Sequence, residues 1–234
     1  MVSLPDVYLP VDRLFPDFVS TALLENFESA DELWPDELPH IANAARKRRL
    51  DFRAGRHCAR AALSKAGCPP VPIGRGAGRE PLWPAGFVGA ISHARIVAGA
   101  AVARTEHTAG LGLDIEARDT CDLALWQRLG TPAERTAAEA QVSAQDALLL
   151  TFSAKEAFYK AQYTRSGQWL GLRGAEVALD GNGARFEITL LQAVPEVGPA
   201  GARFEGRYLI SGDVICTGIC LPPVHPDGLA AARA

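Results

Sequence analysis

The chain has 234 residues, of which 48% are hydrophobic and 22% are charged, and its formal net charge is -3. This length and composition are typical of a folded protein with one large or two small domains, and they exclude a disordered chain. The lack of a basic excess excludes a protein whose main role is to coat nucleic acid, so any phosphate binding is expected to be local.

The cysteines and the chain start indicate a reducing compartment. The five cysteines are Cys58, Cys68, Cys121, Cys216 and Cys220. None is spaced as C-x-x-C, which argues against a zinc site, and their odd number argues against a disulfide framework. The first residues carry acids and prolines where a signal peptide has a basic and then an apolar run, and no apolar stretch approaches the ~20 residues that span a bilayer. We therefore expect a cytoplasmic protein that does not bind membranes.

In the first half, a helix is predicted to begin at Ser20, and a longer one over residues 40–66. The longer segment is rich in Ala, Arg and Leu and ends at Gly67 and the Pro69-Pro70 pair. A loop rich in Gly and Pro follows over residues 71–86. The next apolar runs predict three strands, at residues 87–92, 96–103 and 109–116.

In the second half, residues 120–150 are predicted to be helical, with a break at Gly130 after which Thr131 caps a new helix with Glu134 in the reciprocal position. A helix over residues 152–163 comes next. Four strands are then expected at residues 175–180, 185–191, 203–210 and 214–221, the first two joined as a hairpin. Helix followed by strands in both halves predicts an α+β protein of two lobes, which we divide into residues 1–115 and 116–234.

The helix over residues 152–163, "FSAKEAFYKAQY", places small and apolar residues on one side, which is expected to pack inward. These residues are Ala154, Ala157, Phe158 and Ala161. The other side combines aromatic and charged residues, namely Phe152, Lys155, Glu156, Tyr159, Lys160 and Tyr163. Two interpretations remain open: an exposed face with a Glu156–Lys160 pair, or a functional carboxylate flanked by ammonium groups.

The strand "GLGLDIE" places Asp114 and Glu116 on one face, while Leu113 and Ile115 point the other way. Two carboxylates ~6–7 Å apart on one strand can converge on one cation. Oxygen-only ligands favour Mg²⁺ or Mn²⁺, with water and substrate phosphates completing the coordination. The alternative is a strand end whose acids face water.

Further polar residues could contact an anion. Ser92 and His93 follow each other on a strand and point to opposite faces, so they do not form a catalytic dyad, but His93 could donate to a phosphate with Ser92 assisting. Arg49, Arg53, Arg56 and Arg60 form a basic stripe on the helix over residues 40–66. This stripe is either a solvated face or a phosphate grip. The loop "GRGAGRE" lacks the Lys-Ser/Thr ending of a P-loop.

Taken in order, the basic helix, "GREPLWPAGFVGAISHA", "GLGLDIEARD" and "FSAKEAFYKA" resemble the Sfp-type 4'-phosphopantetheinyl transferases, in the branch that includes siderophore-associated and mycobacterial-type members. The resemblance runs from about residue 40 to residue 175. It implies a monomer of two α+β lobes related by a pseudo-twofold, with coenzyme A in the cleft between them. The implied reaction moves phosphopantetheine from coenzyme A to a serine of an apo acyl or peptidyl carrier protein and releases 3',5'-ADP.

The resemblance also implies residue roles. Asp114, Glu116 and Glu156 would hold Mg²⁺, and Glu156 would accept the serine proton, with Lys155 and Lys160 stabilising charge on the phosphates. The implied contacts to coenzyme A are Arg48, Arg56, Arg75, Ser92, His93, Asp114, Lys155 and Lys160. The family often has Ser or Thr where this chain has Ala90, which removes one hydroxyl contact. The competing interpretations are another Mg²⁺-dependent phosphotransferase and a catalytically silent module that binds coenzyme A or a carrier protein.

Overall fold

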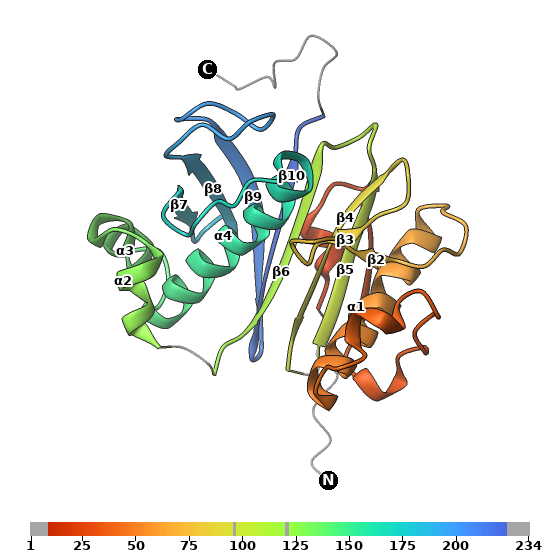
Figure 1. Ribbon diagram of the computed structural model, residues 1–234. Helices are drawn as coiled ribbons and strands as arrows, with labels where there is room; N and C mark the ends of the chain where they lie inside the picture. Colours follow the sequence, from red (N-terminus) through yellow and green to blue (C-terminus); the bar gives the residue numbers. More distant parts are fainter. Residues whose placement is uncertain (1–8, 96, 120–121, 224–234) are drawn as a thin grey trace.

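The computed structural model describes residues 9–95, 97–119 and 122–223, and it contains two antiparallel sheets that each carry one long helix (Figure 1). The first sheet has the strand order β1-β5-β4, with β1 at Ser20–Leu24, β4 at Phe87–Ala94 and β5 at Val97–Arg104. Helix α1, at Arg46–Lys65, packs on this sheet. This arrangement and the second half together confirm the predicted α+β class.

The second sheet has the order β6-β10-β9-β8-β7. Its strands are β6 (Gly110–Ala117), β7 (Ala175–Asp180), β8 (Arg185–Leu190), β9 (Arg203–Ser211) and β10 (Val214–Leu221). Helix α4, at Ala144–Ser166, packs on β6 and β10. The described halves therefore share a plan, one helix on one sheet, but differ in strand number, three against five.

Short elements connect these layers. They are the 3-10 helices η1 (Val11–Leu14), η2 (Phe27–Ser29), η3 (Leu38–Ile41) and η4 (Leu123–Leu125), the two-stranded ribbon of β2 (Gly74–Arg75) and β3 (Pro81–Leu82), and helices α2 (Trp126–Leu129) and α3 (Pro132–Glu139). The Thr131 hydroxyl accepts the Glu134 N–H at 3.1 Å, which confirms the predicted cap of α3, whereas the Glu134 carboxylate, expected in the reciprocal position, binds Lys155 and the Val177 N–H. None of the described helices combines the length and apolar character that crossing a bilayer requires.

Two expectations for the first half are wrong. The segment from Ser20 forms strand β1, because its backbone pairs with the apolar strand β5, where Thr21 lies opposite Ala101. The helix expected from residue 40 begins at Arg46, since the preceding residues form the short helix η3 and a turn. Strand pairing with a buried neighbour outweighs the weak local helix preference of a short segment.

The expected division at residues 115 and 116 falls inside strand β6. Because β6 pairs along its whole length with β10, it belongs to the second sheet. The chain passes from one sheet to the other in the turn between β5 and β6. The predictions for the C-terminal part of the chain are confirmed: its four strands form, and β7 and β8 pair as a hairpin.

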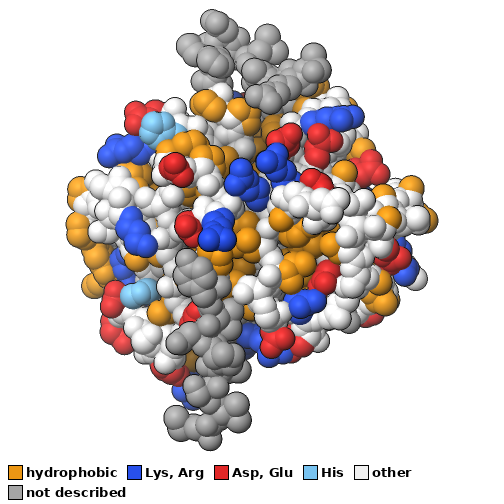
Figure 2. Space-filling view, turned by 180° about the vertical axis from the view of Figure 1, so that it is seen from behind, with side chains coloured by type: hydrophobic (Ala, Val, Ile, Leu, Met, Phe, Trp, Pro, Cys, Tyr) orange, Lys and Arg blue, Asp and Glu red, His pale blue; other side chains and the backbone are white. Residues whose placement is uncertain are grey.

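The sheets meet where β4 lies beside β6 (Figure 1). The Ser92 hydroxyl accepts the Ile115 N–H across this seam at 3.1 Å. Away from the two helices, apolar residues of both sheets form one cluster with the N-terminal segment; these include Leu14, Phe15, Val88, Leu113, Ile115 and Cys216. Seen from behind, acidic and basic side chains are interspersed with apolar ones (Figure 2). The lobes therefore share a core instead of hinging on a linker.

Four cysteines lie within the described residues, and all are free thiols. Cys58, Cys68 and Cys216 are buried, and Cys220 is half-buried. Burial raises the pKa of Cys58, Cys216 and Cys220 to about 12, so these thiols stay protonated and unreactive. Cys121 lies outside the described residues.

Helix α4 sits unusually close to strand β6 because two residues of the strand lack side chains. A Cβ atom at Gly112 would overlap the Ala157 carbonyl oxygen, and one at Gly110 would overlap that of Ala161. Ala154, Ala157 and Ala161 are fully buried at this contact, as predicted. Small residues on both elements thus let the helix backbone rest on the strand.

We predict that Gly112→Ala destabilises the protein by about 3 kcal/mol, because the added methyl group meets backbone that cannot move independently. The midpoint of urea unfolding measures the loss. Gly171→Ala is the matched control, since a Cβ there has its nearest neighbour at 3.9 Å. Equal stability of the Gly112 variant and the wild type would show that helix and strand are not in tight contact.

Candidate functional site

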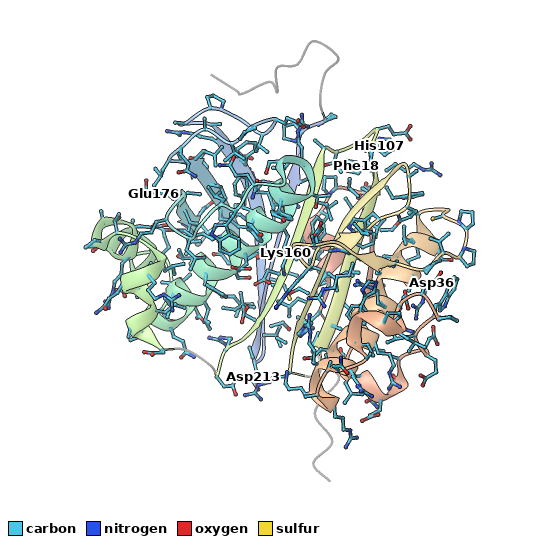
Figure 3. All side chains as sticks on the ribbon, viewed as in Figure 1. Phe18, Asp36, His107, Lys160, Glu176 and Asp213 are labelled. Atoms are coloured by element: carbon cyan, nitrogen blue, oxygen red, sulfur yellow. The ribbon has the colours of Figure 1, made fainter. Side chains whose placement is uncertain are left out.

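A pocket of about 270 Å³ opens where α1, β4, β6 and α4 approach one another. It is lined by cationic and acidic side chains: Arg48, Arg56, Arg75, Arg79, His93, Lys160, Asp51, Asp114 and Glu116. Lys160 lies near the centre of the molecule, between the two halves (Figure 3). Most of the residues singled out in the sequence therefore meet in one place, although they come from positions more than 100 residues apart.

At the centre of the pocket, Lys160 links the two lobes. Its ammonium group donates to Asp114 Oδ1 at 2.7 Å, to the Leu113 carbonyl at 3.0 Å and to Ser92 Oγ at 3.0 Å. Ser92 in turn donates its hydroxyl proton to Asp114 Oδ1 at 2.9 Å. Because Asp114 is only 4% exposed, this charge-assisted network fixes the carboxylate. Ser92 holds Asp114 here, whereas the sequence suggested a direct role toward an anion.

The negative charge of the carboxylates in the site is only partly balanced by nearby cationic side chains. Burial and then the charge of Asp114 raise the pKa of Glu116 to about 8, and the same two causes, in the same order, raise the pKa of Glu156. The second oxygen of Asp114, Oδ2, is buried without a hydrogen-bond partner. A buried carboxylate oxygen without a donor is costly, so this place is suited to a cation.

The same carboxylates do not form a complete metal site by themselves. Within residues 9–95, 97–119 and 122–223, no group of three or more His, Cys, Asp or Glu side chains is arranged to hold a metal ion. The predicted set of Asp114, Glu116 and Glu156 therefore fits a cation only if oxygens of a bound substrate and water complete the coordination. All three ligands are carboxylates, which suits Mg²⁺ or Mn²⁺ and disfavours softer metals.

Glu156 lies one turn before Lys160 on α4 and borders an adjoining pocket with an aromatic wall. The Tyr159 ring packs against Trp169 at 4.9 Å and against Tyr163 at 5.3 Å between centroids. Trp169 is 71% exposed, which is high for so large an apolar side chain. This environment favours the functional interpretation of the helix face over that of a plain solvated surface.

The arginine stripe on α1 divides into two groups. Arg49, Arg53 and Arg60 turn away from the pocket and bind the segment at residues 27–44, for example through Arg49 Nη2 to the Ala42 carbonyl at 2.6 Å and Arg53 Nη1 to Glu32 at 3.0 Å. Arg56 of the stripe lines the pocket, and so does Arg48, which lies at the edge of the stripe. The stripe is therefore neither a single phosphate grip nor a simple solvated face.

Lys155 is not where the sequence placed it. Its ammonium group is buried on another side of α4, donates to the Leu129 carbonyl at 2.8 Å and pairs with Glu134 at 2.9 Å. The predicted pair of ammonium groups beside Glu156 is thus reduced to Lys160. Helical periodicity placed Lys155 on the open side because it assumed that only one face of the helix is buried. In the structure, α4 is covered by the sheet and also by α3.

Two residues of the pocket were not assigned a role from the sequence. Asp51 is 5% exposed and accepts from Lys47 at 3.1 Å. It lies on the same helix face as Arg48, so helical spacing could have identified it. Arg79 has a left-handed backbone, with φ at 74°, which turns the ribbon at this point. The sequence groups Arg79 with Arg75 among the arginines of the glycine-rich loop, but it gives Arg79 no specific contact.

We predict that Lys155→Met costs about 3–5 kcal/mol of stability, because it leaves the Glu134 carboxylate buried and unpaired. Glu134 also accepts the Val177 N–H at 2.8 Å, so Glu134→Gln keeps that contact while removing the charge. The double variant should recover most of the lost stability in urea unfolding. A Lys155→Met protein as stable as the wild type would refute the buried ion pair.

Comparison with known proteins gives matches over both lobes. The model of the 4'-phosphopantetheinyl transferase N-terminal domain matches residues 36–103, and that of the 4'-phosphopantetheinyl transferase superfamily matches residues 110–198. The first match ends with β5 and the second begins with β6. The two matches thus follow the two sheets.

Individual relatives agree with these two family matches. The chain is 34% identical to the 4'-phosphopantetheinyl transferase Npt of Nocardia iowensis, over 89% of this chain and 98% of that protein. It is 38% identical to the 4'-phosphopantetheinyl transferase Svp of Streptomyces mobaraensis, over 86% and 83% of the two chains. It is also 38% identical to enterobactin synthase component D of Escherichia coli K12, over 58% of this chain and 65% of that protein. With its site, its fold and these likenesses, the chain belongs to the Sfp-type 4'-phosphopantetheinyl transferases.

Proposed function

We propose that this enzyme transfers the 4'-phosphopantetheine group of coenzyme A to a serine hydroxyl of an apo acyl or peptidyl carrier protein and releases 3',5'-ADP. The observation that supports this proposal best is the joining of Asp114 and Lys160 in a pocket lined by arginines, because phosphoryl transfer needs fixed charges of both signs around a pyrophosphate. The pocket lies between the two lobes, where the resemblance implies coenzyme A.

The serine oxygen attacks the phosphorus next to the pantetheine, and the bond from this phosphorus to the bridging oxygen of the pyrophosphate breaks. The serine hydroxyl loses its proton, and we assign its acceptance to Glu156, directly or through one water. Burial and the nearby Asp114 raise the pKa of this carboxyl, which makes it a stronger base than an exposed glutamate when it is ionised. The leaving group is 3',5'-ADP, whose new charge needs a cation nearby.

The cations of the pocket have separate roles in this proposal. Lys160, already aimed at the seam between the lobes, stabilises charge on the pyrophosphate. Arg48, Arg75 and His93 bind the remaining phosphate of coenzyme A, since guanidinium groups form paired hydrogen bonds with phosphate oxygens. Ser92 supports Asp114, and Arg56 adds positive charge from a buried position. Lys155 takes no part, because it is paired elsewhere.

Asp114, Glu116 and Glu156 would hold Mg²⁺, or Mn²⁺ in its place. When bound, the metal neutralises negative charge on the pyrophosphate during bond breaking. The unpartnered Oδ2 of Asp114 and the raised pKa of Glu116 support this assignment. Both features indicate a place where the protein alone leaves negative charge unbalanced.

We further propose that the enzyme works in the cytoplasm and as a monomer. Buried free thiols at Cys58, Cys68 and Cys216 suit a reducing compartment. Each long helix finds its sheet within the same chain, and one shared cluster joins the lobes, so the pocket is complete without a second copy. Acyl, peptidyl and siderophore-type carriers are all candidate substrates.

We predict that an apo carrier protein incubated with this enzyme, coenzyme A and Mg²⁺ gains the mass of one phosphopantetheine. Intact-mass spectrometry measures the gain, and chelation of the metal should abolish it. Glu156→Gln should lower the rate about 10²-fold or more, because it removes both a base and a carboxylate ligand. Binding of coenzyme A without transfer to acyl or peptidyl carriers would favour the silent binding module.

We predict that Arg48→Ala raises the KM for coenzyme A about tenfold, the effect of losing one charge-assisted contact to a phosphate. The kcat should change less, because Arg48 lies in the pocket away from Glu156. Arg49→Ala is the matched control, since its guanidinium binds the carbonyls of Ala42 and Ala44. Equal KM values for both variants would contradict the assignment of Arg48.

A further inference from the structure

Glu37 is a fully buried carboxylate in the first lobe, and it does not line the pocket. Its exposed fraction is 0%, and three donors surround it. Oε2 accepts from Arg60 Nη1 at 2.7 Å and from the Trp34 N–H at 3.0 Å. Oε1 accepts from the Ile73 N–H at 3.0 Å. Such a carboxylate is expensive to bury, and here two of its three bonds, to Arg60 and to Ile73, tie separate chain segments together.

Glu37 holds Ile73 from one side, and Arg56 holds it from the other. Arg56 Nε donates to the Ile73 carbonyl at 2.8 Å, and its Nη2 donates to the Gly74 carbonyl at 2.9 Å. Two nitrogen atoms of Arg56 therefore donate to backbone carbonyls, although the side chain also lines the pocket. Both polar groups of Ile73, which is itself fully buried, are thus bound by charged side chains.

The clamped residue directly precedes the ribbon formed by β2 and β3. Arg75 pairs with Pro81 across this ribbon, and the Gly76 N–H donates to the Glu80 carbonyl at 2.8 Å. The tip carries Arg79, and both arginines reach the pocket. A ribbon of two short strands is not stable alone, so its position depends on its contacts at both ends: the tip, where Gly78 lies against Tyr163 of α4, and the clamped base.

The segment that carries Glu37 contacts the ribbon a second time. Arg75 Nη1 donates to the His40 carbonyl at 3.4 Å, a long bond that leaves the guanidinium free to turn toward a ligand. Arg60 adds a contact to the ring of Trp34, 5.8 Å from its centroid. Helix η3 and the residues before it therefore form a support on which the ribbon rests, with Glu37 at its centre.

We propose that Glu37 is a positioning residue for coenzyme A binding, which acts through Ile73 and Arg56 to fix the ribbon and so to aim Arg75 at the ligand's phosphate. This inference rests on the function proposed above. Glu37 itself does not line the pocket, and its charge balances the buried guanidinium of Arg60. A Gln at this place would keep only one acceptor oxygen, which cannot bind both Arg60 and the Ile73 N–H, so one of the two links that hold the base of the ribbon would be lost.

The test is Glu37→Gln, with steady-state kinetics and with calorimetric titration of coenzyme A. We expect the KM and the Kd for coenzyme A to rise about tenfold, while the kcat and the KM for the carrier change less than about twofold. Glu32→Gln is the matched control, because Glu32 lies in the same segment and binds Arg53, but its side chain is 87% exposed. This control should behave as the wild type.

A second pair of measurements separates positioning from simple stabilisation. In an Arg75→Ala background, Glu37→Gln should raise the KM for coenzyme A by much less than tenfold, because the group it positions has gone. The proposal would be overturned if Glu37→Gln raised the KM tenfold in the Arg75→Ala background as well. It would also be overturned if Glu37→Gln lowered the melting temperature but left the Kd for coenzyme A unchanged. If Glu37→Gln does not fold, Glu37→Asp keeps the pairing with Arg60 but is too short to reach Ile73 as well, and it should raise the Kd in the same direction.

Failure of the proposed function has a different signature. A wild-type protein that binds coenzyme A but does not modify any carrier would refute the transferase, yet the calorimetric effect of Glu37→Gln would still be expected. Conversely, full transfer activity in the wild type together with an unchanged Kd in both Glu37 variants would refute only the positioning role.

Discussion

The close approach of helix α4 to strand β6 is the constraint on which the site depends. Gly110 and Gly112 leave room for the helix backbone, and the alanines of α4 use it. As a result, Lys160 reaches Asp114 at 2.7 Å in a hydrogen-bonded ion pair, and Glu156 lies one turn before Lys160 on the same helix. A side chain on either glycine would push the helix outward, and the charges would separate even if the fold survived.

The electrostatics of the pocket follow from that geometry. Burial of Glu116, and then repulsion by the carboxylates of β6 and α4, raise its pKa to about 8. Lys160 offsets part of this repulsion, and arginines from α1 and the ribbon supply positive charge nearby. The free site thus holds charges whose balance is completed by a cation and a polyanionic substrate together, which suits the transfer of a phosphoryl group.

The two long helices have unlike tasks. Helix α4 presents reactive groups directly, whereas α1 presents Arg48 to the pocket and uses most of its other arginines to hold the segment at residues 27–44 and the ribbon. Arg56 does both, because its guanidinium lines the pocket while it binds the backbone of Ile73. A basic stripe on a helix can therefore be largely structural, even next to an anion site.

The sequence by itself determined the α+β class, most strands, the inward face of α4 and the set of residues that gather at the site, since residue periodicity and the motifs around Asp114 and Glu156 are local patterns. It did not determine where Lys155 points or why Glu37 is buried. Helical spacing gives an angle but not how many sides of a helix are covered, and Glu37 is buried by partners 23 and 36 residues away. Only the tertiary structure decided these points, because burial and ion pairing depend on which distant segments pack together.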